Sequence, residues 1–133
     1  RAEDPYETVK VVDPEIEKIP IKRKDKTTKL AGEDAPDLAS VIFDLDLFTA
    51  IYRGYRSHAK DFLSPAELKY LYDCIHLIPL ELGIRFLADH VAGDVYFKVR
   101  YPGHNLRRAL VQFKLAESIE AREPAIRKVL GES

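Results

Sequence analysis

Hydrophobic residues recur at spacings of three and four over most of the chain after residue 36, as amphipathic helices require. The first such pattern lies within residues 37–59. Its apolar positions are Val41, Leu45, Phe48, Tyr52 and Tyr55. Asp44 or Asp46 can cap a helix that continues to about Ala59, since aspartate accepts hydrogen bonds from the free N–H groups of a first turn. The pattern therefore predicts a first long helix.

A second helix is predicted to begin at Ser64. Ser64 can cap, Pro65 suits the first turn, and Glu67 can complete a capping box. The apolar positions that follow are Leu68, Leu71, Tyr72, Ile75 and Ile78. Pro79 removes a backbone donor, so we expect the helix to bend or split there. Its second half then covers residues 80–92 and ends at Gly93.

A third helix is predicted after an irregular stretch over residues 94–101. Asn105 is expected to cap it. Its expected inner positions are Leu106, Leu110, Phe113, Leu115 and Ile119. A short last helix is predicted from Pro124 to Leu130. The sequence thus predicts an all-α domain over residues 33–133, with three main helices.

Residues 1–32 have a different character. Three prolines interrupt helical patterns, and short runs of valine and isoleucine could form two strands. We predict an extended arm, separate from the helical domain. The run over residues 22–29 is basic, but acidic residues elsewhere in the arm nearly cancel it, so nucleic-acid binding is not favoured.

Composition narrows the range of functions. The net charge is −1, which argues against a general binder of nucleic acid or anionic membranes. No apolar run of membrane-spanning length and no secretory signal is visible, so a cytoplasmic protein is expected. Cys74 is the single cysteine; we interpret it as a small buried hydrophobe. The chain contains no methionine, even at position 1, which suggests a processed or excised piece.

The candidate chemistry centres on Arg85 and Asp89, which lie four apart in an apolar helical run. Asp89 either neutralises Arg85 as a core ion pair, or Arg85 points into a pocket and holds a polar ligand. Spacing alone favours the ion pair. No metal site is predicted: the four histidines lack metal-binding spacing, and Asp44 and Asp46 fit helix capping better.

Basic residues gather around Gly103, where the third helix begins. They are Lys98, Arg100, Arg107 and Arg108. A helix N-terminus with basic neighbours can hold an anion. A solvated basic rim is the interpretation that we favour.

Several sequence strings carry a resemblance to a known family. They are Leu80 to Asp94, Tyr96-Phe97-Lys98, Pro102-Gly103-His104-Asn105-Leu106, Arg108, Gln112-Phe113-Lys114-Leu115 and Glu117, with Glu33 to Leu38 and Phe43 to Phe48 upstream. Together they resemble the C-terminal end of the N-acetylhexosamine 1-kinases, in the aminoglycoside phosphotransferase-like family. The resemblance covers roughly residues 33–122. His90 departs from it, since relatives often carry tyrosine there.

The resemblance implies the helical C-terminal subdomain of a kinase-like fold. The implied reaction is transfer of the ATP γ-phosphate, with Mg²⁺, to the anomeric hydroxyl of an N-acetylhexosamine. Arg85 and Tyr96 match the positions that lie by the sugar. The family's catalytic-loop aspartate, metal-binding aspartate and nucleotide lobe precede the matching region. We therefore expect this chain to be inactive alone, with a catalytic lobe as its partner. The alternative is a stand-alone helical interaction module derived from such a kinase.

Overall fold

The computed structural model describes residues 31–59 and 62–131, and all regular structure in these ranges is helical. The elements are the 3₁₀ turn η1 (Leu38–Ser40) and the helices α2 (Leu45–Ala59), α3 (Pro65–Lys69), α4 (Leu71–Ala92), α5 (His104–Ala121) and α6 (Glu123–Val129). The expected all-α class is confirmed over the described residues. Most of the predicted arm over residues 1–32, including its two strands, lies outside them.

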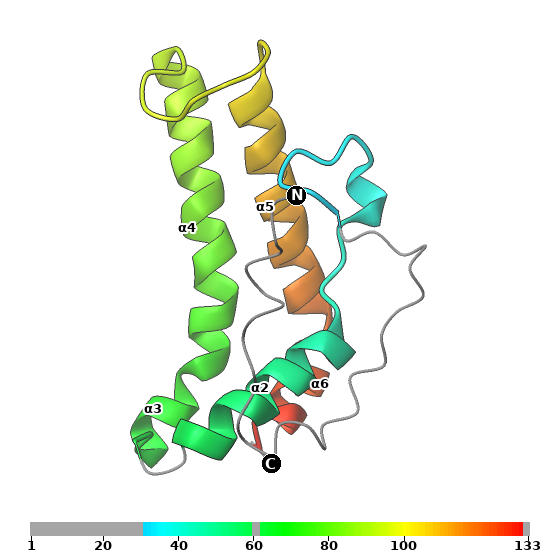
Figure 1. Ribbon diagram of the computed structural model, residues 1–133, viewed down its shortest axis with the longest axis vertical. Coiled ribbons are helices and arrows are strands. Elements are labelled where there is room, and N and C mark those ends of the chain that lie inside the picture. The colour runs from blue at the N-terminus through cyan, green and yellow to red at the C-terminus, as the bar shows by residue number, and fades with distance from the viewer. Residues whose placement is uncertain (1–30, 60–61, 132–133) are drawn as a thin grey trace, which may run out of the picture.

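The long helices α4 and α5 form an antiparallel hairpin along the longest dimension of the molecule (Figure 1). The loop that joins them is at one end, and α2, α3 and α6 gather at the other. Gly83 lets the two helices approach closely, because a Cβ at this position would lie 2.6 Å from Cε1 of Phe113. The hairpin therefore positions its loop far from the three shorter helices.

An apolar cluster stabilises the end of the hairpin that lies opposite the loop. Its buried members are Tyr72, Ile119, Ile126 and Leu130, from α4, α5 and the α6 region. Phe48 and Tyr52 of α2 pack against them. Ile126 is 0% exposed and Ile119 is 2% exposed, so this cluster holds the largest fully buried apolar side chains of the described chain.

The predicted helix starts and stops are largely confirmed. Asp44 accepts a hydrogen bond from the Leu47 N–H at 3.0 Å, as expected of a cap before α2. Ser64 and Glu67 form the predicted capping box: the Glu67 N–H donates to the Ser64 hydroxyl, and the Ser64 N–H donates to the Glu67 carboxylate. Gly93 ends α4 in the left-handed conformation, with φ of 93°.

Two boundary predictions are wrong. Of the bend or split expected at Pro79, the split does not occur: α4 continues across Pro79, and the break lies at Tyr70, between α3 and α4. Pro79 is buried inside the long helix, and tertiary packing of such a helix outweighs the loss of one backbone donor. Asn105 is not a cap, since α5 begins at His104 after Gly103, and Asn105 lies buried in its first turn.

Several residues expected inside the domain lie on its surface. They are Tyr55, Cys74, Ile78 and Leu110. Helix α4 carries apolar residues on all its sides, so their periodicity does not reveal which side meets α5. In the described part of the chain, no helix combines the length and apolar character needed to cross a bilayer.

Candidate functional site

The loop between α4 and α5 is organised around one carboxylate, that of Asp89. Its Oδ1 accepts hydrogen bonds from the N–H groups of Val95 (2.9 Å) and Tyr96 (2.7 Å). Its Oδ2 accepts from the N–H of Phe97 (2.9 Å) and from Nδ2 of Asn105 (2.8 Å). Asp89 is 6% exposed. A loop without regular structure leaves its N–H groups unpaired, and this side chain pairs three of them in succession.

These hydrogen bonds decide the charge of Asp89. Burial by itself raises the pKa of the carboxyl group. The bonds from Phe97, Tyr96, Val95 and Asn105 act in the opposite direction and together hold the pKa of Asp89 below its usual value. Asp89 is therefore an ionised group at neutral pH, stabilised by N–H dipoles.

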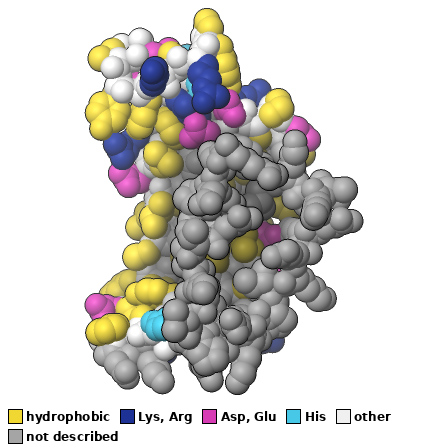
Figure 2. All heavy atoms as spheres, viewed as in Figure 1, with side chains coloured by type: hydrophobic (Ala, Val, Ile, Leu, Met, Phe, Trp, Pro, Cys, Tyr) yellow, Lys and Arg dark blue, Asp and Glu magenta, His cyan; other side chains and the backbone are white. Residues whose placement is uncertain are grey.

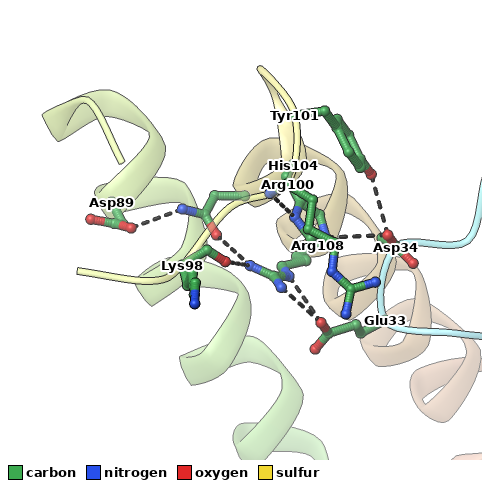
Figure 3. A network of polar contacts seen from close by, with 9 residues as sticks. Glu33, Asp34, Asp89, Lys98, Arg100, Tyr101, His104 and Arg108 are labelled. Atoms are coloured by element: carbon green, nitrogen blue, oxygen red, sulfur yellow. Dashed lines mark hydrogen bonds and ion pairs between the residues drawn. The ribbon is translucent and has the colours of Figure 1, made fainter. Parts of the chain in front are cut away.

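Asn105 extends the network from Asp89 to Arg108 of α5 and, through it, to Glu33 of the N-terminal segment. Figure 3 shows Asp89, Arg108 and Glu33 in this network. Its Nδ2 also donates to Oδ1 of Asp94 at 3.0 Å. Its Oδ1 accepts from Nη1 of Arg108 at 3.1 Å, and the same Nη1 donates to the carbonyl of Lys98. Nε and Nη2 of Arg108 lie 3.0 and 2.9 Å from Oε1 of Glu33. One chain of polar contacts thus joins α4, the loop, α5 and the segment before η1.

His104 fastens the same segment at a second point. Its Nδ1 accepts the Arg100 N–H at 3.1 Å, so the proton of the neutral ring is on Nε2. This Nε2 lies 3.1 Å from Oδ2 of Asp34, and the Tyr101 ring stacks on the imidazole at 4.5 Å. Partial burial and the carboxylate of Asp34 raise the pKa of Tyr101. His104 is 1% exposed, which makes it a structural contact of the fold.

The predicted ion pair between Arg85 and Asp89 is wrong. The loop N–H groups and Asn105 occupy the Asp89 oxygens, and Arg85 points outward with its side chain half exposed. The nearest acidic oxygen to its guanidinium is Oε1 of Glu81, at 3.9 Å, which is a weak exposed pair. The two residues lie one turn apart on neighbouring positions of α4, but the Asp89 carboxylate is occupied by the loop and Asn105.

Arg85 and Tyr96, the two residues assigned to the sugar by resemblance, lie together. Cζ of Arg85 is 5.9 Å from the Tyr96 ring centroid and 5.6 Å from that of Phe97. The Phe97 ring packs edge-on against Tyr96 and also against Phe86 of α4. Tyr96 is 75% exposed. The three side chains form an open surface, which we call the Arg85–Tyr96 surface, with aromatic faces beside a guanidinium.

A pocket that the described residues form lies away from the Arg85–Tyr96 surface. A cavity of about 400 Å³ lies at the opposite end of the molecule, between α3 and the end of α6. Leu68, Tyr70 and Leu130 contribute to its walls. The expectation that Arg85 points into a pocket is therefore not met by this cavity.

The contacts also bear on the two other candidate sites, the basic residues near Gly103 and a metal site. Among the basic residues near Gly103, Arg108 is engaged by Asn105, the Lys98 carbonyl and Glu33. Among the described residues, no three His, Cys, Asp or Glu side chains come together as a metal ion would need. Sequence reasoning missed the roles of Asn105 and Glu33. The one available signal was a polar residue within an otherwise apolar helix start.

No protein-family model matches this chain.

Proposed function

We propose that this chain is the substrate-side helical part of an ATP-dependent sugar 1-phosphotransferase acting on an N-acetylhexosamine in the cytoplasm. The residue strings that resemble such kinases support the proposal. So does the all-helical architecture of the region they cover. The chain's own task is to hold the sugar.

The proximity of Arg85 and Tyr96 is the observation that carries the proposal. A sugar offers C–H faces and a ring of hydroxyl groups. An aromatic ring suits the former, and the multi-donor fork of an arginine suits the latter. Asp89 holds the loop that carries Tyr96, so the aromatic group is positioned before a ligand arrives. Preorganisation of this kind lowers the ordering cost of binding.

ATP and Mg²⁺ are assigned to a catalytic lobe outside the matched region. The resemblance places the family's metal-binding aspartate before the matched region. The proposal therefore places no catalytic residue in this chain. Arg85 and Tyr96 act by binding and orienting the sugar.

Binding can be measured on the ¹⁵N-labelled chain by NMR. Addition of N-acetylglucosamine or N-acetylgalactosamine, up to about 50 mM to cover weak affinities, is expected to shift the Arg85 Nε–H signal and the amides of residues 94–97. Arg85→Lys should remove these shifts, because lysine keeps the charge but loses the planar fork. Arg53→Lys, at an exposed position of α2, is the matched control and should change nothing. Shifts that persist in Arg85→Lys would remove Arg85 from the site.

A second candidate function is a stand-alone helical interaction module. The observation that favours it is the exposed apolar side of α4, where Leu77, Ile84 and Val91 are 58%, 60% and 80% exposed. The two functions differ in their response to N-acetylhexosamines. In a coupled ADP-release assay with ATP and Mg²⁺, both predict no turnover by the purified chain alone. Sustained turnover would contradict both.

A further inference from the structure

The segment that precedes α2 lies along α5 (Figure 1). We call residues 33–43 of this segment the strap. Its apolar part packs on α5 through a small buried cluster, which comprises Ala35, Val41 and Val111. Its charged start lies nearer the α4–α5 loop, at the end of the molecule where Figure 2 shows acidic and basic side chains gathered together. The strap is therefore anchored on α5 both by apolar burial and by charge.

Arg108 joins the charged start of the strap to the α4–α5 loop. Its Nε and Nη2 lie 3.0 and 2.9 Å from Oε1 of Glu33. Its Nη1 donates to the Lys98 carbonyl at 3.0 Å and to Oδ1 of Asn105 at 3.1 Å. The side chain of Arg108 is 11% exposed, against 58% for Glu33. A guanidinium is a rigid planar fork, so a carboxylate that holds one edge of it also fixes the direction of the other edge.

Two sets of contacts connect Arg108 to the loop. In the polar set, Asn105 donates to Oδ2 of Asp89 at 2.8 Å, and Asp89 accepts the loop N–H groups. In the aromatic set, Cζ of Arg108 lies 5.5 Å from the Phe86 ring centroid, and the Phe86 and Phe97 centroids are 4.6 Å apart. A change in the orientation of Arg108 therefore alters both supports of the loop.

We propose that Glu33 is a positioning residue for the loop that carries Tyr96, because its carboxylate holds Arg108 in the orientation that orders this loop. Without this carboxylate, a nearly buried guanidinium lacks its counter-ion, so Arg108 turns toward water and releases the Lys98 carbonyl. The strap thus sets the order of a loop to which it does not belong. The ordering itself does not require a sugar. Its consequence for sugar binding rests on the proposed function of the Arg85–Tyr96 surface.

Hydrogen exchange of the full ¹⁵N-labelled chain tests the proposal. In Glu33→Gln, the amides of residues 95–97 should exchange about three- to tenfold faster, because an ion pair with one nearly buried partner contributes more than a fully exposed pair. Glu117→Gln is the matched control: the same change at a 68% exposed carboxylate of α5, which pairs with Lys114 at 3.1 Å. It should leave the loop amides within about twofold of wild type. Unchanged loop exchange in Glu33→Gln, or equal acceleration in both variants, would overturn the proposal.

A double-mutant cycle tests whether Glu33 acts through Arg108. Arg108→Lys keeps a charge for Glu33 but loses the planar fork, so the loop amides should exchange faster. The Phe43 N–H, which donates to the Ser118 hydroxyl at 2.8 Å, should keep its wild-type exchange and so show that the strap stays on α5. Adding Glu33→Gln to Arg108→Lys should accelerate loop exchange by less than about twofold more. Independent, multiplicative effects of the two substitutions would contradict the assigned role of Arg108.

NMR titration with N-acetylglucosamine separates this inference from the proposed function. If both hold, Glu33→Gln should raise the dissociation constant by about the factor that it adds to loop exchange, because only the ordered loop binds. An unchanged sugar affinity beside faster loop exchange would overturn the role of Glu33 in binding. A wild-type chain that binds no N-acetylhexosamine would contradict the proposed function, whereas the hydrogen-exchange comparison would still decide whether Glu33 orders the loop.

Discussion

The two ends of the α4–α5 hairpin are stabilised in opposite ways. At the loop end, polar groups are buried: Asp89, His104 and Asn105 are 6%, 1% and 0% exposed and make hydrogen bonds or ion pairs. At the other end, the buried groups are apolar and come from several helices, with Ile119 and Ile126 at the centre. The same two helices thus carry two different kinds of core.

The difference follows from what the backbone needs at each end. The loop over residues 94–97 has no regular structure, so its N–H groups depend on the Asp89 carboxylate. At the other end, the backbone N–H and C=O groups are hydrogen-bonded within the helices. The helices are therefore held together by burial of their apolar side chains. Loss of apolar burial should therefore lower the free energy of unfolding of the whole described fold. Loss of the polar network should free the loop first.

The largest effect is expected at the apolar end. Ile126→Ala should lower the free energy of unfolding by about 2–5 kcal/mol, since it removes methylene groups from a fully buried site and leaves a cavity. Urea denaturation monitored by circular dichroism measures this change. Ile51→Ala, at an exposed site of α2, should stay within about 0.5 kcal/mol of wild type. Equal effects at the two positions would contradict the assigned core.

At the loop end, Asp89→Ala should release the loop. The amides of Val95, Tyr96 and Phe97 lose their acceptor and should exchange with solvent at least about tenfold faster. The amides in the middle of α5 should change much less. Hydrogen exchange followed by NMR gives both rates in one experiment. Asp73→Ala, at an exposed acidic position on the same helix, is the control. Equally fast exchange of the loop amides in Asp73→Ala would argue against a specific role of Asp89 in holding the loop.

The hydrogen bonds from the loop N–H groups to the Asp89 carboxylate should weaken as the pH falls. Hydrogen bonds hold the pKa of Asp89 below the ordinary value of 3.8, so its contribution is fully present above that pH. The contribution is lost as the pH falls through the lower, folded-state pKa. NMR titration of the Val95 amide between about pH 5 and pH 2 should follow this loss. Asp89→Asn should abolish this titration of the Val95 amide signal. A hydrogen bond from the Val95 N–H that became stronger as the pH fell would contradict the prediction.

The smallest effect is expected at the start of α3. Ser64→Ala removes the cap and should cost about 1 kcal/mol, because one N–H of the first turn loses its acceptor. Thermal unfolding should show a slightly lower Tm. Ser64→Asp, which restores an acceptor, should recover most of the difference. A loss as large as that of Ile126→Ala would mean that α3 belongs to the central core.

Local signals in the sequence predicted most helix boundaries. The capping box at Ser64 and the glycine stop at Gly93 act through neighbours within a few residues, so the sequence alone reveals them. Pro79 and Asn105 were predicted wrongly because distant contacts override the local preference. Pro79 is buried within a continuous helix, and Asn105 is turned into the interior by Asp89 and Asp94.

The sequence by itself determined the helical class, the helix starts and the closeness of Arg85 to Asp89 along one helix. The tertiary structure alone decided that Asp89 turns inward to the loop while Arg85 turns outward to Tyr96. The reason is physical: α4 is apolar on every side, so its own pattern does not distinguish an inner from an outer face. The inner face is selected by its packing partners, which are α5 and the loop that follows α4.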